Sequence, residues 1–257
     1  MSSTPRLFVS PGLSAGHPIA LDDEQSNYLL RVLRLQVGAP VRVFNGRDGE
    51  WEACIDAVQG KRASLLPTVQ MRAQPEVPVS APVLLFAPVK KSETDFIVEK
   101  ATELGAAHIR PVLTERTQTR TVRLDRFRKI ALEAAEQTER LDLPEIADLQ
   151  PLAAALDALE SGTLVIYCDE AGDDTEAPWG GETGRAGPIA DVLATLDEAP
   201  VALLIGPEGG FTADERAWLR GRGDTRPVSL GPRILRAETA VVAALSVLQA
   251  LRGDWRS

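Results

Sequence analysis

Residues 203–215 read LLIGPEGGFTADE, and this stretch indicates how the second half of the chain folds. An apolar run ends at Ile205, a glycine-rich turn follows, and Thr212 and Glu215 have the spacing of a helix capping box. A strand, a loop and a helix in this order are typical of an open α/β sheet, which binds ligands at the carboxyl ends of its strands. The loop is therefore either a ligand-binding loop or a tight turn whose glycines supply positive φ angles.

The glycine-rich turn does not have the sequence of a phosphate loop. Residues 206–210, GPEGG, lack the Gly-Lys-Ser/Thr ending of a Walker A motif and do not match GxGxxG. Glu208 would repel a phosphate, whereas its carboxylate suits hydroxyl groups or a cationic ligand.

Residues 229–245, SLGPRILRAETAVVAAL, repeat the order of strand, Gly-Pro loop and helix. Two such loops at one edge of a sheet could hold a small ligand through main-chain groups. Arg233 and Arg236 would be cations beside it, and Glu238 lies at a helix start, where a carboxylate is favoured. The alternative is that Arg236 and Glu238 only cap the helix and pair with each other.

Outward from these loops, the sequence predicts strands that alternate with helices. This alternation indicates a mostly parallel sheet with both faces covered. The expected strands are 83–89, 108–113, 163–168, 201–205 and 226–230, and the expected helices are 93–104, 124–140 and 238–252.

The first part of the chain has a different character. Three prolines within residues 75–82 exclude a helix or a central strand there, and we place a domain boundary in this stretch. Short β-type runs precede it, with one helical segment, and together they predict a small barrel. The runs are 6–9, 41–44, 51–58 and 62–70, the helix is 23–35, and the predicted division is a barrel domain at 1–72, a linker at 73–82 and an α/β domain at 83–257.

Charge is distributed unevenly along the chain. The net charge is −9, yet residues 141–200 alone contain fourteen acidic residues and one basic residue. Residues 114–129 contain six basic residues, which either contact RNA phosphates or form a solvated face. No membrane-spanning run, signal segment or Cys/His metal motif is visible, so we expect a cytoplasmic protein without a metal.

Several collinear segments resemble one family. LLIGPEGGFTADE and LGPRILRAETA are similar to the two C-terminal motifs of the RsmE family, the SAM-dependent methyltransferases that make N3-methyluridine in 16S ribosomal RNA. LLRVLRL (29–35), KATELGAAHIRPVLTER (100–116) and KIALEAAEQTERLDLPEI (129–146) also resemble its conserved blocks. The chain departs from the family pattern at Glu139, where a glycine is common, and at Glu93, where a basic residue is usual.

The resemblance implies a fold, a cofactor and a substrate. The fold is a PUA-like β-barrel followed by a SPOUT-type α/β domain with a deep trefoil knot. The expected partners are the 16S rRNA of the 30S subunit, in its decoding region, and a second copy of the chain as a homodimer. The residues expected to bind S-adenosylmethionine (SAM) are Leu204, Gly206, Glu208, Gly210, Leu230, Gly231, Ile234 and Leu235.

The implied chemistry requires loss of the proton on uridine N3. We expect Arg236 to stabilise the developing uracil anion. The proton acceptor could be Glu136, Glu238 or solvent. The residues expected to bind RNA are Arg31, Arg34, Lys90, Arg116, Arg120, Arg123 and Arg140.

Two other functions compete with methylation. A non-catalytic RNA-binding factor for ribosome assembly would share the basic surface but would not bind SAM. A phosphoryl-transfer enzyme would use the glycine loop, but the missing Gly-Lys-Ser/Thr disfavours it.

Overall fold

The computed structural model describes residues 4–76, 81–170, 186–196 and 199–256. The chain divides into two units. The first unit runs to Val77 and also includes Ala135–Leu143, whereas the second contains Pro78–Ala134 and Pro144–Ser257. The first of these boundaries lies among the prolines at 75–82, and the sequence pattern gave no sign that a later segment packs with the first unit.

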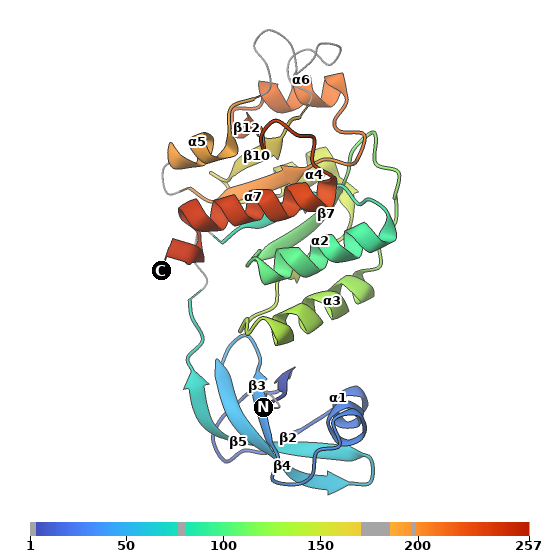
Figure 1. Cartoon of the computed structure of the whole chain (residues 1–257), viewed down its shortest axis with the longest axis vertical. Coiled ribbons are helices and arrows are strands. Elements are labelled where there is room, and N and C mark those ends of the chain that lie inside the picture. Colours follow the sequence, from blue (N-terminus) through green and yellow to red (C-terminus); the bar gives the residue numbers. More distant parts are fainter. Residues whose placement is uncertain (1–3, 77–80, 171–185, 197–198, 257) are drawn as a thin grey trace. The chain divides into compact units, whose positions relative to one another are not determined.

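The first unit is built on a five-stranded sheet in the order β1-β3-β4-β5-β2 (Figure 1). β4 and β5 are long antiparallel partners, and register shifts interrupt their pairing, as β-bulges do where a sheet curves. Buried aliphatic side chains from these strands, from Leu29 and from the connecting residues Val9, Leu13 and Leu21 form its core. The strands are β1 (Arg6–Phe8), β2 (Ile19–Ala20), β3 (Pro40–Phe44), β4 (Glu50–Gln59) and β5 (Arg62–Arg72).

The helix expected at 23–35 is shorter than the sequence predicts. Asp22 caps α1 (Asp23–Asn27) through a capping box with Gln25, and a π-helical turn, Tyr28–Val32, follows directly. The chain leaves the helix by Arg34, which adopts a φ of 55°. A non-glycine residue in this left-handed region ends a helix, which the apolar spacing of residues 29–35 could not reveal.

The second unit contains a parallel sheet in the order β12-β10-β11-β6-β7-β8, with β9 paired to β7 (Figure 1). The alternating pattern predicted its main strands. The strands are β6 (Val83–Phe86), β7 (His108–Leu113), β8 (Glu145–Ile146), β9 (Gln150–Pro151), β10 (Leu164–Cys168), β11 (Val201–Ile205) and β12 (Thr225–Val228).

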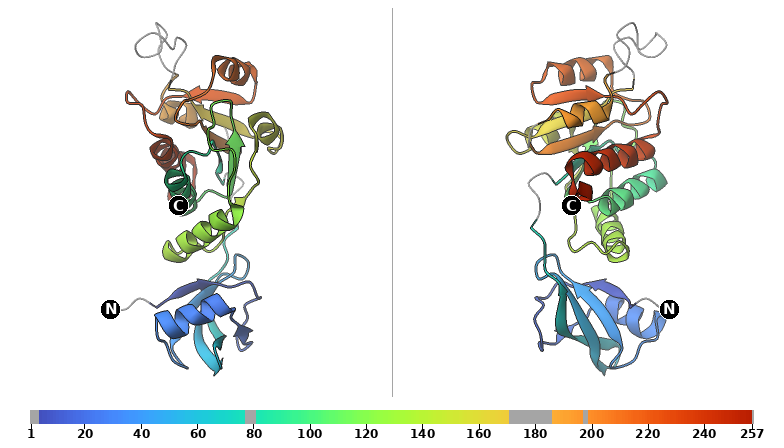
Figure 2. Two further views of the ribbon diagram at one scale, coloured as in Figure 1. Left: turned by 90° about the vertical axis from the view of Figure 1, so that its right-hand side faces the viewer. Right: turned by 60° about the vertical axis from the view of Figure 1, so that its left-hand side comes forward.

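Helices cover both faces of this sheet (Figure 2). Successive residues of β11 point to opposite faces of the sheet, and each face is apolar. Leu203 and Ile205 pack with α2, α5 and α7, whereas Ala202 and Leu204 pack with α4 and α6. The apolar strands are therefore buried on both sides, as parallel strands are. The helices are α2 (Lys91–Glu103), α3 (Leu124–Gln137), α4 (Leu152–Asp157), α5 (Ile189–Ala194), α6 (Ala213–Gly221) and α7 (Ala237–Arg252), and a 3-10 turn (Asp254–Arg256) follows α7.

α3 ends three residues before the position that the sequence predicts. It stops at Gln137, and Glu139 has a φ of 60°. This is the position at which the resembled family commonly has glycine, the residue that adopts positive φ without steric cost. The short elements β2, β8, β9, α4 and α5 were not predicted, because each is too brief to show a period.

Candidate active site

The loop after β11 is a tight turn. The Gly210 N–H donates to the carbonyl oxygen of Pro207 at 2.8 Å, and Gly210 has a φ of 64°. Gly206 lies against the Phe211 ring, which a Cβ at that position would approach to 3.1 Å. Side chains are therefore disfavoured at both glycines, while the Glu208 carboxylate is exposed between them.

α6 begins where the sequence predicts. Thr212 is its N-cap, and the capping box with Glu215 is complete: the Glu215 N–H donates to Thr212 Oγ1 at 3.2 Å, and the Thr212 N–H donates to Glu215 Oε2 at 2.9 Å. The end of the glycine loop is thus fixed by main-chain hydrogen bonds.

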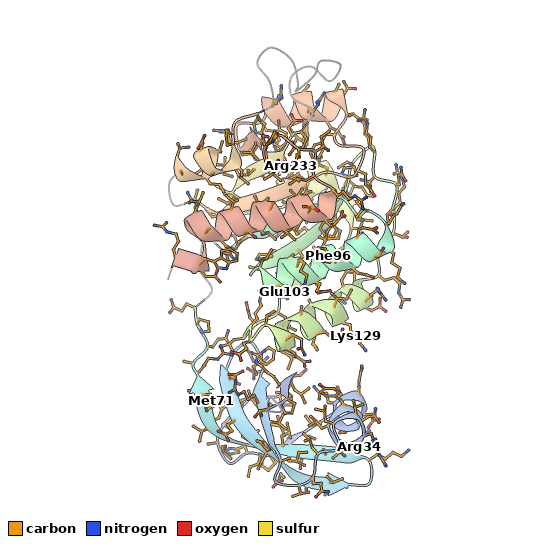
Figure 3. The ribbon with its side chains drawn as sticks, viewed as in Figure 1. Arg34, Met71, Phe96, Glu103, Lys129 and Arg233 are labelled. Atoms are coloured by element: carbon orange, nitrogen blue, oxygen red, sulfur yellow. The ribbon has the colours of Figure 1, made fainter. Side chains whose placement is uncertain are left out.

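The loop after β12 makes a second turn. Gly231 has a φ of 105°, and its N–H donates to Oγ of the buried Ser229 at 3.1 Å. Further along, the Ile234 side chain is 77% exposed, and Leu235 is half-buried. The hydrogen bonds of the described residues leave the N–H groups of Ile234 and Leu235 without a partner. Arg233 lies on this loop (Figure 3).

Strand order brings the two loops to one edge of the sheet. β10 lies between β11 and β12, and all three are parallel, so their carboxyl ends face the same way. The site therefore also includes the end of β10, which the sequence analysis did not single out. Its residues are Asp169 and Glu170, and the signal that could have found them is an acidic pair directly after a buried strand.

The end of β10 supports both loops. The Leu230 N–H donates to Oε1 of Glu170 at 3.4 Å. Asp169 is 2% exposed, and its carboxylate lies 3.0 Å from Nη2 of Arg220 and 3.7 Å from Nη1 of Arg216, both on α6. A buried carboxylate between two guanidinium groups anchors α6 to the sheet, and α6 starts directly after the glycine loop.

These loops fit the chemistry of SAM. Their turns expose main-chain groups that can recognise an adenine edge, and Glu208 offers an acceptor for ribose hydroxyls or a partner for the sulfonium charge. The exposed Ile234 gives an apolar surface for a ring. The loop does not suit a polyphosphate, because the exposed Glu208 carboxylate would repel it and the loop has no lysine.

Arg236 and Glu238 lie at the start of α7. Arg236 is the N-cap residue, is exposed, and makes no side-chain cap hydrogen bond, while Glu238 is half-buried in the first turn. The guanidinium of Arg236 therefore does not cap the helix. Glu93 lies near enough to Arg236 to feel its charge. A hydrogen bond from Ser92, one from its own main chain, and the charges of Lys90 and Arg236 hold the pKa of the Glu93 carboxyl below its usual value.

Glu136, the other proton-acceptor candidate, belongs to the first unit. Its Oε1 accepts a hydrogen bond from the Phe8 N–H at 2.9 Å. The contact gives this carboxylate a structural role at the end of α3.

The candidate RNA-binding residues differ in their surroundings. Arg31, Lys90 and Arg120 are exposed, whereas the guanidinium of Arg123 pairs with Asp125. Arg140 pairs with Asp142 at 2.7 Å and its side chain is 11% exposed.

Two candidates have distinctive backbone or side-chain geometry. Arg34 has a positive φ and follows Leu33, the residue that caps the π-helical turn (Figure 3). Arg116 donates from Nη1 to the carbonyl oxygen of Gly209 at 2.7 Å, so it contacts the glycine loop.

Two features are absent from the residues that the structure describes. None of their helices has the length and apolar character needed to cross a membrane. In the same part of the chain, no three His, Cys, Asp or Glu side chains gather as metal ligands would.

Comparisons with known proteins match the chain to two families. A family described as an RNA methyltransferase domain matches residues 75–249, and one described as an RNA methyltransferase PUA domain matches residues 21–67. The first match includes both loops and most of α7. The second lies within the sheet and helix of the first unit.

Similar proteins cover nearly the whole chain. The ribosomal RNA small subunit methyltransferase E of Synechocystis sp. is 35% identical over 96% of this chain and 77% of its own length. That of Rickettsia conorii is 31% identical over 96% of this chain and 95% of its own. A crystal structure of the Neisseria gonorrhoeae protein of this name, bound to S-adenosyl methionine, is 27% identical, with a TM-score of 0.79 and coverage of 96% and 98%.

Proposed function

We propose a function from the family to which this chain belongs, the ribosomal RNA small subunit methyltransferase E family. The chain transfers the methyl group of SAM to N3 of a specific uridine in the decoding region of 16S rRNA. The observation that carries the proposal is that two glycine-containing loops follow the carboxyl ends of β11 and β12, the parallel strands on either side of β10. A third strand end, bearing Asp169 and Glu170, supports them both.

The cofactor-binding residues are proposed on these two loops. Bound SAM supplies an electrophilic methyl group on a sulfonium sulfur. The chain holds the cofactor through main-chain groups of Gly206, Gly210 and Gly231, through the exposed carboxylate of Glu208, and through the apolar Ile234. The side chains of Leu204 and Leu230 pack into the hydrophobic cores on the two faces of the sheet, next to the strand ends from which the loops start.

Arg236 is proposed to stabilise the uracil anion. Uridine N3 must lose its proton before its lone pair attacks the methyl group, and negative charge then spreads onto the flanking carbonyl oxygens. A guanidinium offers hydrogen-bond donors and a positive charge to such an oxygen. Arg236 is exposed at the end of the second loop, so a base can reach it.

Glu238 is the favoured proton acceptor. It lies in the same helical turn as Arg236, whereas the carboxylate of Glu136 already accepts a hydrogen bond from the main chain of Phe8. The N3 proton passes first to Glu238 or on to water, and the N3–methyl bond then forms as the sulfur–methyl bond breaks.

Exposed basic residues in both units are proposed to bind the phosphates of rRNA. In the first unit these are Arg31 and Arg34, and in the second they are Lys90, Arg120 and Arg123. Arg140 is omitted, because its guanidinium is mostly buried against Asp142. We also propose the assembled 30S subunit as the partner, a homodimer as the active form, and the trefoil knot as the threading of the two loops.

The decisive experiment is methylation of 30S particles that lack the modification, with SAM labelled on its methyl group. The expected result is label in 16S rRNA, in a nucleoside that elutes as N3-methyluridine. Particles from a strain that retains the modification are the control, because their target nitrogen already carries a methyl group. Binding to 30S particles without SAM binding or label transfer would instead favour a non-catalytic assembly factor.

A further inference from the structure

Arg116 and Gly209 lie 93 positions apart in the chain and are joined by a hydrogen bond of 2.7 Å from Nη1 to the carbonyl oxygen. The aliphatic part of the arginine also rests on this glycine. A Cβ built on Gly209 would lie 3.4 Å from Cδ and 3.5 Å from Cβ of Arg116. Although the residue is exposed, its side chain thus lies along the glycine loop.

A second link joins the same two segments. The Glu115 N–H donates to Oε1 of Glu215 at 2.8 Å, while the other oxygen of Glu215 accepts from Thr212 in the capping box. One carboxylate therefore fastens the turn after β7 to the beginning of α6. The pair Glu115-Arg116 contacts the glycine loop both near its middle and at its end.

The turn that carries Arg116 is itself held firmly. The Thr114 N–H donates to Oγ1 of the buried Thr117 at 2.9 Å, and Thr119 Oγ1 donates to the carbonyl oxygen of Val89 at 2.7 Å. The arginine is consequently presented from a fixed support at the carboxyl ends of β6 and β7.

The peptide unit between Gly209 and Gly210 is the one that Arg116 restrains. Its N–H donates to Pro207, and its carbonyl oxygen accepts from Arg116. Two successive glycines have wide conformational freedom, and rotation of this peptide would reverse the donor and the acceptor that the loop presents. A charged donor on the carbonyl side opposes that rotation.

We propose that Arg116 is a positioning residue that preorganises the SAM-binding loop, and not primarily a phosphate contact as its place in the basic segment suggested. The inference rests on the proposed function, since the loop is taken to hold the cofactor. Restraining the loop in advance lowers the entropy lost on binding, so Arg116 acts on SAM affinity without touching the reacting atoms.

The test compares Arg116→Ala with Arg116→Lys and with Arg110→Ala in the full-length protein. Arg110 is the control: it is half-buried, and like Arg116 it donates to a main-chain oxygen, that of Ala158, at 3.2 Å. SAM affinity is measured by calorimetry, and exchange of the Gly210 amide is followed without SAM by nuclear magnetic resonance.

Arg116→Ala is expected to weaken SAM binding about tenfold, the effect of a lost charge-assisted hydrogen bond. The Gly210 amide should exchange faster, the melting temperature should stay close to that of the wild type, and the KM for SAM should rise more than kcat falls. Arg116→Lys should recover part of the affinity, and Arg110→Ala should bind SAM like the wild type.

Unchanged SAM affinity and unchanged Gly210 exchange in Arg116→Ala would overturn the inference, even if the wild type methylates 30S particles. Loss of RNA affinity alone, with a smaller salt dependence, would likewise overturn it and return Arg116 to the phosphate contacts. Failure of the wild type to bind SAM would instead refute the proposed function. In that case Gly210 exchange still decides whether Arg116 positions the loop.

Discussion

Nε of Arg6 lies 2.5 Å from Oε1 of Glu50, and both side chains are buried, at 6% and 2% exposure. The same guanidinium donates to the carbonyl oxygens of Ala135 and Arg140 at 2.6 and 2.5 Å. Arg6 therefore joins the sheet of the first unit to the segment Ala135–Leu143, and Glu50 compensates its charge.

Replacing Arg6 with methionine should destabilise the first unit by about 3–5 kcal/mol, because the Glu50 carboxylate and two carbonyl oxygens lose a buried donor. Hydrogen exchange read peptide by peptide is the suitable measurement, since two units can unfold separately. Arg62→Met is the control: its pair with Asp23 is 71% and 78% exposed and should matter little. Equal protection of β1 and β4 in both variants would contradict the assignment.

Acid should weaken the first unit through Glu50. Burial alone would raise the pKa of this carboxyl, but hydrogen bonds from Arg72 and Arg6 outweigh it and hold the pKa below its usual value. The unfolded state then takes up the proton first as the pH falls, so stability present above about pH 4.3 is lost at lower pH. Urea unfolding from pH 7 downward should show this loss for the wild type and a weaker loss for Glu50→Gln.

Glu139→Gly should make the protein more stable than Glu139→Ala by about 1 kcal/mol, since only glycine adopts the observed φ of 60° without strain. Both variants lose the same contacts, to Arg42 at 3.6 Å and Arg72 at 3.9 Å, so their difference isolates the backbone. Thermal unfolding measures it. Equal melting temperatures would show that the turn relaxes to another conformation.

Arg236→Ala should slow methyl transfer by about 100-fold to 1,000-fold, the usual effect of removing a donor to a developing anion. SAM affinity should stay near that of the wild type. Single-turnover methylation of 30S particles, together with calorimetry, separates the two effects. Arg226→Ala, another exposed arginine of the same unit, is the control, and near-normal turnover in Arg236→Ala would remove Arg236 from the mechanism.

Binding to rRNA should weaken steeply with salt between about 50 and 200 mM, because neutralised phosphates release counterions. Arg120→Ala should lower the slope of log K against log salt by about one, as expected for one lost phosphate contact. Arg140→Ala should leave the slope unchanged, because that side chain is engaged by Asp142. Filter binding to unmodified 30S particles provides the measurement, and identical slopes for the wild type and Arg120→Ala would exclude Arg120 from the interface.

Periodicity and cap chemistry predicted the long elements of this protein. The strand over Val201–Ile205 and the capping box at Thr212 and Glu215 are local features, determined by residues within a few positions of each other. Family motifs supplied the cofactor and the substrate. The predicted ends of two helices were wrong, because each helix ends near a residue in the left-handed region, Arg34 or Glu139, and apolar spacing does not report φ.

The sequence by itself thus determined the two fold types, the glycine loops and the absence of a phosphate-loop lysine. Only the tertiary structure decided which distant residues share a site: Arg116 with Gly209, Glu170 with Leu230, and Arg6 with the turn after α3. The physical reason is that strand order, not chain order, sets which carboxyl ends are neighbours. A long side chain at one of these strand ends can then form a hydrogen bond with a residue at the next, and no local sequence pattern specifies that residue.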